Sequence, residues 1–570
     1  MRQFIRQYAP YYKNYKRQFI FAIIGILMVA AGTSGTAYVI KPVLDEIFIN
    51  KDREMLQLLP LAVIFLYSLK GFGKYIQTYY VSYIGTDIIR IVRDKFLSHI
   101  LTQNLKFFNQ KHGGELVSRV TNDINSIQSG VSSHIATILS ETATVMALIG
   151  VVIYQSPKLA FYGLIVLPVI IYPLSKLAKK MKKLSHKRQK KVSSLTSILN
   201  EIFNNIELII ANNSQRSRSK GFENTNREYF NLNLKSVKTN ALVSPIMEIV
   251  GAIAAAIVIS FGGIEVINGD LSVGEFFSFM TALFMLYTPI KKLSSVYNSF
   301  QKAIAANERI NDIFQTSSDI IDGKKDLTEQ IKTIEFKNIS LKYDEKIALN
   351  NINIKIEKGK KVALVGDSGG GKSSLVNLLL RFYDPFNGKI NFNNTNINEY
   401  TFESLRNTIS IVTQRVYIFN DTIANNIALG VKVDEERVKF VLKQAHALEF
   451  VESSTQGIHT QLDEFGTNLS GGQRQRIAIE RALYKDPQIL IFDEATSALD
   501  NESESIISKV LDEVSQNRIT FVIAHRLSTI QNADKILLFK NGEILGRGTN
   551  EELLTNCPEY KKLKALSENK

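Results

Sequence analysis

Two glycine-containing stretches in the second half of the chain have the composition of phosphate-binding sites. The first, GDSGGGKS, follows the apolar strand-like segment KVALV and precedes the helix-like segment SSLVNLLLRF. Glycines let backbone N–H groups turn inward around a phosphate, and the dipole of the following helix favours an anion. A glycine-rich turn alone would be ordinary, but the strand and helix supply the context of a nucleotide-binding loop. Its residues are Gly366, Asp367, Ser368, Gly369, Gly370, Gly371, Lys372, Ser373 and Ser374.

The residue types in and after this loop predict hydrolysis of a nucleoside triphosphate. Lys372 would reach the β- and γ-phosphates, and the Ser373 hydroxyl would bind Mg²⁺. Downstream, QILIFDEAT predicts a buried strand that ends in Asp493 and Glu494. Asp493 would hold the Mg²⁺ shell, and Glu494 would polarise or position the attacking water. Two solvated carboxylates at a strand end would explain either residue alone, but not their combination with the loop.

The second stretch, NLSGGQRQR, begins at Asn468 and opens the predicted helix QRQRIAIERAL. Its hydroxyl and backbone N–H groups would form another anion site at a helix N-terminus. The residues concerned are Ser470, Gly471, Gly472 and Gln473. The two phosphate sites could meet within one chain or between two chains, and the residues by themselves leave both possibilities open.

The elements around these sites divide the chain into a membrane half and an α/β half. A membrane helix needs ~20 mostly apolar residues. Six runs have that length, although each alone could be a buried core helix: 19–40, 55–76, 134–154, 159–177, 242–267 and 273–297. From IEFKNISLKY onward, strands and helices alternate, which is typical of an α/β domain with a mostly parallel sheet. We expect an all-α transmembrane domain of six helices at 1–320, a linker at 321–333 and an α/β P-loop cassette at 334–570.

Charge predicts the orientation in the membrane and argues against nucleic acid. The formal net charge is +15, but Lys and Arg cluster beside the apolar runs, as on the cytoplasmic side of a membrane protein. Both termini and the cassette are therefore expected in the cytoplasm. The connections 78–133 and 178–241 show helical spacing and predict membrane helices that extend into the cytoplasm. Polar breaks near Asn109 and Asn212 predict short transverse helices able to touch the soluble domain.

LSGGQ between a P-loop and a D-E strand resembles the signature of ATP-binding-cassette exporters, and the similarity covers nearly the whole chain. The resemblance implies a half-transporter that works as a homodimer, with each signature closing over ATP held by the partner's P-loop. It further implies adenine stacking by Tyr343, Mg²⁺ sensing by Gln414, cross-subunit contacts by Glu464 and Asp500, and a γ-phosphate contact by His525. ATP and Mg²⁺ are thus the expected ligands.

The membrane half, with LKGFGKYIQTYY and FFNQKHGGELVSRVTND, is similar to the group of bacterial lipid A flippases and related multidrug exporters. The resemblance implies that Lys70 and Lys291, with Lys74 and Lys292 nearby, line a cavity for a phosphorylated glycolipid. Thr288 and Ser140 stand where the flippases have arginine, which weakens the match to lipid A itself. We expect ATP-driven flipping of a lipid or glycolipid across a bacterial inner membrane. A multidrug exporter or a lipid-linked oligosaccharide flippase is the alternative.

Overall fold

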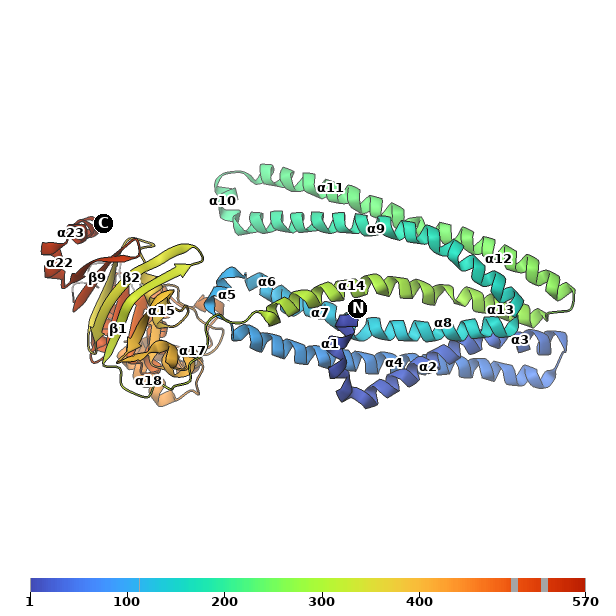
Figure 1. The fold of residues 1–570 in the computed structure, drawn as a ribbon, viewed down its shortest axis with the longest axis horizontal. Coiled ribbons are helices and arrows are strands. Elements are labelled where there is room, and N and C mark those ends of the chain that lie inside the picture. The colour runs from blue at the N-terminus through green and yellow to red at the C-terminus, as the bar shows by residue number, and fades with distance from the viewer. Residues whose placement is uncertain (1, 112, 494–500, 524–531, 569–570) are drawn as a thin grey trace. The chain divides into compact units, whose positions relative to one another are not determined.

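The computed structural model describes residues 2–111, 113–493, 501–523 and 532–568. It divides into two compact units. The helical unit comprises Met1–Ile100 and Gly114–Gln315, and the α/β unit comprises Leu101–Gly113 and Thr316–Lys570. The short segment Leu101–Gly113 therefore belongs with the cassette, although it lies within the first half of the sequence (Figure 1).

Long helices form the helical unit, and several of them pack side by side along their length (Figure 1). In chain order its elements are α1 (Arg2–Tyr12), η1 (Lys13–Tyr15), α2 (Lys16–Tyr38), α3 (Ile40–Pro42), η2 (Val43–Ile49), α4 (Arg53–Leu101), α6 (Gly113–Ser118), η3 (Arg119–Asp123), α7 (Ile124–Ser129), η4 (Gly130–His134), α8 (Ile135–Gln155), α9 (Pro157–Asn204), α10 (Ile206–Ala211), α11 (Gln215–Ala241), α12 (Val243–Ile267), α13 (Val273–Met285) and α14 (Tyr287–Gln315).

Four helical segments of the described residues are long and apolar enough to cross a membrane: Gln3–Ile49, Arg53–Leu101, Gly113–Gln155 and Val273–Gln315. They contain four of the six runs expected from the sequence. The other two runs, 159–177 and 242–267, lie in α9 and α12, where many side chains are outside the described set. All six runs are thus helical. Short helices are also confirmed at the two polar breaks: α5 (Leu105–Gln110) contains Asn109, and α10 ends just before Asn212.

Small residues allow α2 and α4 to approach closely. A Cβ placed on Gly25 would lie 2.7 Å from the backbone nitrogen of Gln77, and one on Gly32 would lie 2.9 Å from the Cβ of Lys70. Glycine therefore brings the backbones into contact, as is common between membrane helices. This contact fixes the part of α4 that carries Lys70.

The segment between α2 and α4, which contains α3 and η2, is joined to the start of α13 by a polar cluster. Ser272 caps α13 in a capping box with Glu275, and its hydroxyl donates to Asp45 at 2.6 Å. Asp45 also accepts the Gly274 N–H at 2.8 Å, while Lys41 pairs with Glu275 at 2.8 Å. The acidic residues of these two segments thus stabilise a helix start and connect distant parts of the chain.

The α/β unit contains two sheets. The larger has the strand order β10-β9-β3-β8-β7-β6, and the smaller has the order β2-β1-β4-β5. The strands are β1 (Thr333–Tyr343), β2 (Lys346–Glu357), β3 (Lys361–Gly366), β4 (Asn387–Phe392), β5 (Thr395–Asn396), β6 (Ile409–Val412), β7 (Ile489–Asp493), β8 (Ile519–Ile523), β9 (Lys535–Lys540) and β10 (Glu543–Gly548). In the larger sheet only the β9–β10 pair is antiparallel, so the prediction of a mostly parallel sheet is confirmed there. The separate antiparallel sheet was not predicted.

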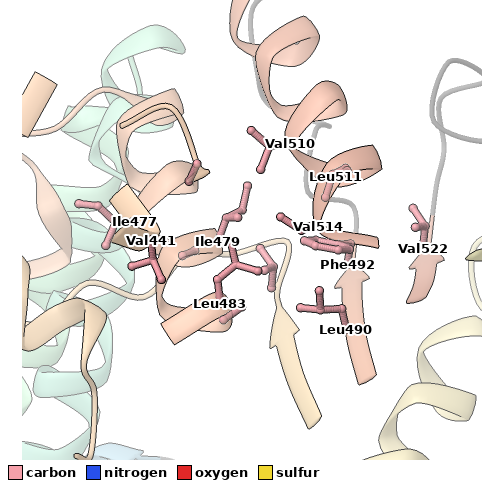
Figure 2. Packing of buried hydrophobic residues seen from close by; sticks show 14 of the residues in the cluster. Val441, Ile477, Ile479, Leu483, Leu490, Phe492, Val510, Leu511, Val514 and Val522 are labelled. Atoms are coloured by element: carbon pink, nitrogen blue, oxygen red, sulfur yellow. The ribbon is translucent and has the colours of Figure 1, made fainter. Parts of the chain in front are cut away.

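The α-helices of this unit are α5, α15 (Lys372–Leu379), α16 (Phe402–Asn407), α17 (Ile423–Ile427), α18 (Glu435–Gln444), α19 (Leu448–Glu452), α20 (Gly471–Tyr484), α21 (Asn501–Ser515), α22 (Asn550–Asn556) and α23 (Pro558–Glu568). Buried side chains anchor α20 firmly: Figure 2 shows Ile479 and Leu483 beside Phe492 of β7 and Val514 of α21. The orientation of α20, and with it the placement of its N-terminus, depends on this apolar core.

One residue of α20 places a carboxyl group in that apolar core. The side chain of Glu480 is completely buried, and neither carboxyl oxygen has a hydrogen-bond partner among the described residues. Burial raises the pKa of Glu480 to about 8, an effect that Arg476 only partly opposes. The carboxyl is therefore neutral in the folded protein at pH 7, because an isolated buried charge would cost much more.

This burial makes the stability of the α/β unit depend on pH. The unfolded chain loses the Glu480 proton near its ordinary pKa, whereas the folded chain keeps it up to about pH 8. The contribution of Glu480 to the free energy of unfolding is most favourable below about pH 4.5. It falls by up to ~1.4 kcal/mol per pH unit as the pH rises to about 8. The difference in unfolding temperature between Glu480→Gln and the wild type should therefore shift by several degrees in favour of the variant when the pH is raised from 5 to 8. Thermal unfolding of the full-length protein tests this, and an offset that is the same at both pH values would contradict it.

Candidate functional site

The loop between β3 and α15 has the conformation of a phosphate cradle. Gly366, Gly369 and Gly371 have φ angles of 134°, 80° and 113°, a region that favours glycine. A Cβ on Gly366 would overlap the carbonyl oxygen of Phe539, and one on Gly371 would lie 2.8 Å from the Leu349 side chain. Backbone conformation thus favours glycine at all three positions, and at Gly366 and Gly371 the available space requires it as well.

Lys372 lies at the start of α15 with its side chain folded over the loop. Its Nζ donates to the carbonyl oxygens of Gly366 at 2.7 Å and Asp367 at 2.9 Å. The side chain is buried, so the ammonium group is held where a phosphate in the loop would meet it. Ser373 is exposed and Ser374 half-buried, which leaves the Ser373 hydroxyl accessible to a ligand.

The carboxyl edge of the parallel sheet places Asp493 on the same side as this loop. Asp493 ends β7 opposite Ile523 of β8, and Ile523 is opposite Leu364 of β3. Two strand spacings separate β7 from β3, which is about 10 Å. Nucleotide phosphates and a hydrated ion can span that gap. Three further predicted site residues, Glu494, Asp500 and His525, lie outside the described residues.

Tyr343 ends β1 near the first turns of α15. Its hydroxyl accepts from Asn377 Nδ2 at 3.2 Å, and its ring meets that of Tyr383 edge-on with centroids 4.8 Å apart. The Tyr383 hydroxyl in turn accepts from Asn109 Nδ2 of α5 at 2.9 Å. A chain of side-chain contacts therefore runs from α5 to the tyrosine expected at the adenine.

The sequence analysis did not identify Tyr383 or Asn377 as part of the site. No sequence motif includes either residue, because their place in the site depends only on how β1, α15 and α5 meet in the fold. The signal that was available was the polar break at Asn109, from which a contact with the soluble domain was predicted. That contact is present within the α/β unit.

Gln414 and Glu464 both occupy exposed positions. Gln414 follows the end of β6, at the carboxyl edge of the sheet beside β7. Glu464 begins η7 (Glu464–Gly466), directly before the exposed Phe465, which has a φ of 62°. A positive φ at a large apolar side chain is uncommon, and this one lies just ahead of the second phosphate motif in the sequence.

The second phosphate motif forms the capped N-terminus of α20. The Ser470 hydroxyl accepts from the Gln473 N–H at 3.2 Å, and the Gln473 side chain accepts from the Ser470 N–H at 2.8 Å. This capping box uses the Ser470 oxygen as an acceptor and leaves its O–H proton available to donate. Ser470 and Gly471 are exposed, while Gly472 is buried.

Gly471 differs from the glycines of the first loop. Its φ is not positive, and a Cβ placed on it would meet no described residue within 4 Å. Neither backbone conformation nor packing against the described part of the chain therefore requires glycine. A residue without a Cβ at this position would allow a ligand from outside to approach the backbone closely.

The two phosphate motifs stand on different parts of the α/β unit. Helix α15 continues from β3 and packs against β2 and β3, whereas α20 packs against α17, α18 and β6. Strands β3 and β6 are separated by β8 and β7 in the sheet, a distance of about 14 Å.

The four lysines expected in a substrate cavity have different surroundings. Lys70 is half-buried and Lys74 is exposed on α4. Lys291 is exposed, with its Nζ 5.7 Å from the centre of the Tyr287 ring. Lys292 forms an ion pair with the buried Glu141 at 2.8 Å. Lys292 thus has a structural partner that the sequence did not indicate.

A protein-only metal cluster is not part of this arrangement: the described residues hold no group of three His, Cys, Asp or Glu side chains suited to one ion. The side chains expected to bind Mg²⁺ all offer oxygen atoms: the Ser373 hydroxyl, the Gln414 amide and the Asp493 carboxylate. They fit Mg²⁺, which binds through one or two protein oxygens together with substrate phosphates and water.

Family comparisons cover both units. Residues 19–290 match the model of the ABC transporter transmembrane region, and residues 349–497 match the model described as ABC transporter. Among solved structures, the chain is similar to a bacterial Atm1-family ABC exporter with ATP bound. The TM-score is 0.82 at 26% identity, covering 97% of this chain and 98% of that one.

Curated relatives match over nearly their full length. The ATP-dependent lipid A-core flippase of Syntrophus aciditrophicus is 42% identical over 96% of this chain and 92% of its own. The ATP-dependent lipid A-core flippase of Vibrio cholerae is 33% identical over 98% and 97%, respectively.

Because glycine has different roles in the two motifs, alanine should be harmful in the first motif and harmless to folding and nucleotide binding in the second. Gly366→Ala introduces a Cβ into an occupied space at a positive φ, so it should lower the unfolding temperature of the protein and abolish nucleotide binding. Gly471→Ala fills open space at a helix start, where alanine is tolerated, and should change neither property. Thermal unfolding and binding of a fluorescent ATP analogue measure both. A loss of stability in Gly471→Ala equal to that in Gly366→Ala would contradict this account.

Proposed function

Because the chain belongs to the ATP-binding-cassette transporter family and couples ATP hydrolysis to transport through an exporter-type membrane region, we propose that it flips a lipid A-like glycolipid. The movement is from the inner to the outer leaflet of a bacterial inner membrane. The observation that carries this substrate class is the near full-length similarity to relatives named lipid A-core flippases.

Within the α/β unit, the nucleotide site binds ATP between the glycine loop and Tyr343. Backbone N–H groups of the loop and the Lys372 ammonium hold the β- and γ-phosphates, and Tyr343 stacks on adenine. Ser373, Gln414 and Asp493 would hold Mg²⁺, which supplies charge neutralisation for the leaving phosphate oxygens. Glu494 orients the attacking water, and His525 contacts the γ-phosphate.

Two chains would complete two such sites. The Ser470 O–H, the Gly471 backbone N–H and the side-chain amide N–H of Gln473 in one chain would be presented to the γ-phosphate in the other chain's loop. The open space at Gly471 and the separation of α20 from β3 in the sheet support this homodimer. Glu464 and Asp500 add contacts across the interface.

Closure of the cassettes would reach the membrane helices through α5. The bond from Asn109 to Tyr383, next to Tyr343, supports this route because it links α5 to the adenine end of the site. ATP binding closes the dimer and opens the membrane region outward, and hydrolysis resets it. With this orientation both termini and the cassette are cytoplasmic.

The substrate's phosphates would meet Lys70, Lys74 and Lys291 in a cavity between the membrane helices. Membrane-embedded lysines are costly unless they face water or an anion, which gives these residues functional weight. Lys292 is engaged by Glu141, so we assign it a structural part in the same region.

A multidrug exporter is the second candidate, favoured by exposed aromatic side chains. Phe277, Phe284 and Tyr287 are 48%, 52% and 41% exposed, and such rings suit amphipathic drugs. Phe279, by contrast, is completely buried and serves packing. A flippase of lipid-linked oligosaccharides would also use lysines for phosphate, so the substrate assay below includes all three classes.

Heterodimers of defined composition test the composite site. A Lys372→Ala chain paired with a Gly471→Ala chain retains one complete site if loop and signature come from different chains. A Lys372→Ala/Gly471→Ala chain paired with wild type then retains none. We expect ATP hydrolysis only in the first heterodimer, each being isolated with two different affinity tags. If each chain completes its own site, the order of activities is reversed.

Glycolipid dependence tests the substrate. In nanodiscs, lipid A-core glycolipid should stimulate ATP hydrolysis saturably above the background of Glu494→Gln. Lys70→Ala should raise the half-maximal glycolipid concentration about tenfold, because a hydrogen bond to a charged group contributes ~1.5 kcal/mol or more. As a matched control, Lys292→Met combined with Glu141→Gln removes a paired lysine together with its partner, and should leave that concentration nearly unchanged. Stimulation by amphipathic drugs or by lipid-linked oligosaccharide, without a glycolipid response, would replace this proposal with the corresponding alternative.

A further inference from the structure

The chain passes between the two units three times, and two of these passages belong to the segment that carries α5. It leaves the helical unit after Ile100, returns at Gly114 and leaves again after Gln315. The end of α4, the start of α6 and the end of α14 are therefore the covalent connections of the helical unit to the α/β unit. Movement of the α/β unit acts on the helical unit first at these three places.

The end of α4 is bonded to the end of α14. The Nε2 of His99 lies 2.9 Å from the carbonyl oxygen of Ile313. Because a carbonyl oxygen can only accept, this nitrogen carries the proton. Helix α14 ends at Gln315, so the Ile313 carbonyl is one of the last four of the helix, for which helix geometry provides no N–H partner. A side chain of α4 thus satisfies a helix end that is distant in sequence.

Aromatic rings pack around the same bond. Phe96, one turn before His99 on α4, is completely buried, and its ring meets that of Phe314 edge-on with centroids 5.4 Å apart. The His99 ring also lies 5.4 Å from the Phe314 ring. Because closely packed side chains cannot shift independently, we expect the ends of α4 and α14 to move together.

The segment that returns from the α/β unit is also bonded to α14. Asp123 of η3 is buried and accepts from Arg309 Nε at 3.0 Å and from Arg119 Nη1 at 2.7 Å. Arg119 donates to Glu115 of α6 at 2.9 Å as well. Two guanidinium groups thus compensate for the burial of one carboxylate. Arg309 lies within the last two turns of α14. The final part of α14 is therefore bonded to the elements on both sides of α5.

The α/β unit ties the same segments together more weakly. Lys106 of α5 pairs with Asp319 at 3.3 Å, but both side chains are largely exposed, so the pair contributes little. The stronger contact of α5 is the bond from Asn109 to Tyr383, next to Tyr343. A displacement that begins at the nucleotide site can thus reach α5, while the firm attachment to α14 is provided by the helical unit.

We propose that His99 and the group Arg119, Asp123 and Arg309 form a clamp that makes the three connections move as one body when nucleotide binds. The clamp rests on the route through α5 proposed above and names the residues of the helical unit that receive the movement. His99 and Arg309 are positioning residues, since neither belongs to the nucleotide site or to the lysines assigned to the substrate. Without the clamp, α5 would shift while α14 stayed in place.

A fluorescence reporter at the ends of α2 and α8 tests the clamp without any transported substrate. The rings of Tyr38 and Tyr154 lie there with centroids 6.0 Å apart. The chain contains no tryptophan, and its single cysteine, Cys557, is buried. Tyr38→Trp is therefore combined with Tyr154→Cys labelled with bimane, a fluorophore that tryptophan quenches at close range. In nanodiscs, a saturating non-hydrolysable ATP analogue should separate these helix ends and raise the fluorescence.

Two substitutions of His99 isolate its hydrogen bond. Both His99→Gln and His99→Asn remove the ring and its contact with Phe314, but only the longer glutamine can place an amide N–H where Nε2 stood. His99→Gln should keep most of the fluorescence increase. In His99→Asn the ratio of separated to closed helix ends should fall about fivefold, the effect of one hydrogen bond on an equilibrium. The half-saturating ATP concentration for hydrolysis should agree within about twofold between the two variants, because neither alters a nucleotide contact.

The ionic part of the clamp has its own matched pair. Arg309→Met removes a bond between α14 and η3, whereas Arg90→Met removes the pair with Asp87, which lies within α4 at 2.8 Å. Only Arg309→Met should reduce the fluorescence increase. Equal increases in His99→Asn and His99→Gln, or in Arg309→Met and Arg90→Met, would overturn the clamp and leave the route through α5 in place. No increase in the protein that carries the reporter alone would overturn the route and the clamp together.

Discussion

The α/β unit depends on one backbone constraint, the turn that links β3 to α15. Gly366, Gly369 and Gly371 adopt positive φ angles, and there is no room for a Cβ on Gly366 beside Phe539 or on Gly371 beside Leu349. Because the turn is this tight, the Lys372 ammonium is held over the loop carbonyls instead of extending into solvent. The buried parallel strands on either side keep the turn in register with Asp493. Binding chemistry at this edge is therefore a consequence of sheet geometry combined with missing side chains.

Sequence reasoning found the elements whose signals are local. The strand-loop-helix context identified the loop at Gly366, apolar length identified the membrane helices, and polar breaks identified α5 and α10. The features it missed depend on residues far apart in the chain. Lys292 and Glu141 are separated by 151 positions, and nothing in either neighbourhood indicates that they pair. Likewise, the smaller antiparallel sheet follows from how β1, β2 and β4 pair, which local alternation does not determine.

A buried glutamate occurs in each unit, and the two are accommodated in different ways. Glu141 is paired with Lys292, so the ion pair compensates for removing the carboxylate from water. Glu480 has no such partner among the described residues and instead stays protonated. It lies on α20, the helix whose N-terminus carries Ser470. Burying this unpaired carboxyl therefore destabilises α20, the helix that positions the second phosphate motif and that is otherwise anchored by apolar contacts.

The N-terminus of α20 presents an exposed surface that could bind an anion. Its capping box satisfies the Ser470 and Gln473 N–H groups, so the helix start is stable without a ligand. Among the described residues, the Ser470 O–H donates to no acceptor, and no neighbour within 4 Å requires the absence of a Cβ at Gly471. A surface of this kind gains its function only when an anion is brought to it. In the homodimer that we propose, ATP held in the loop of a second chain would supply that anion.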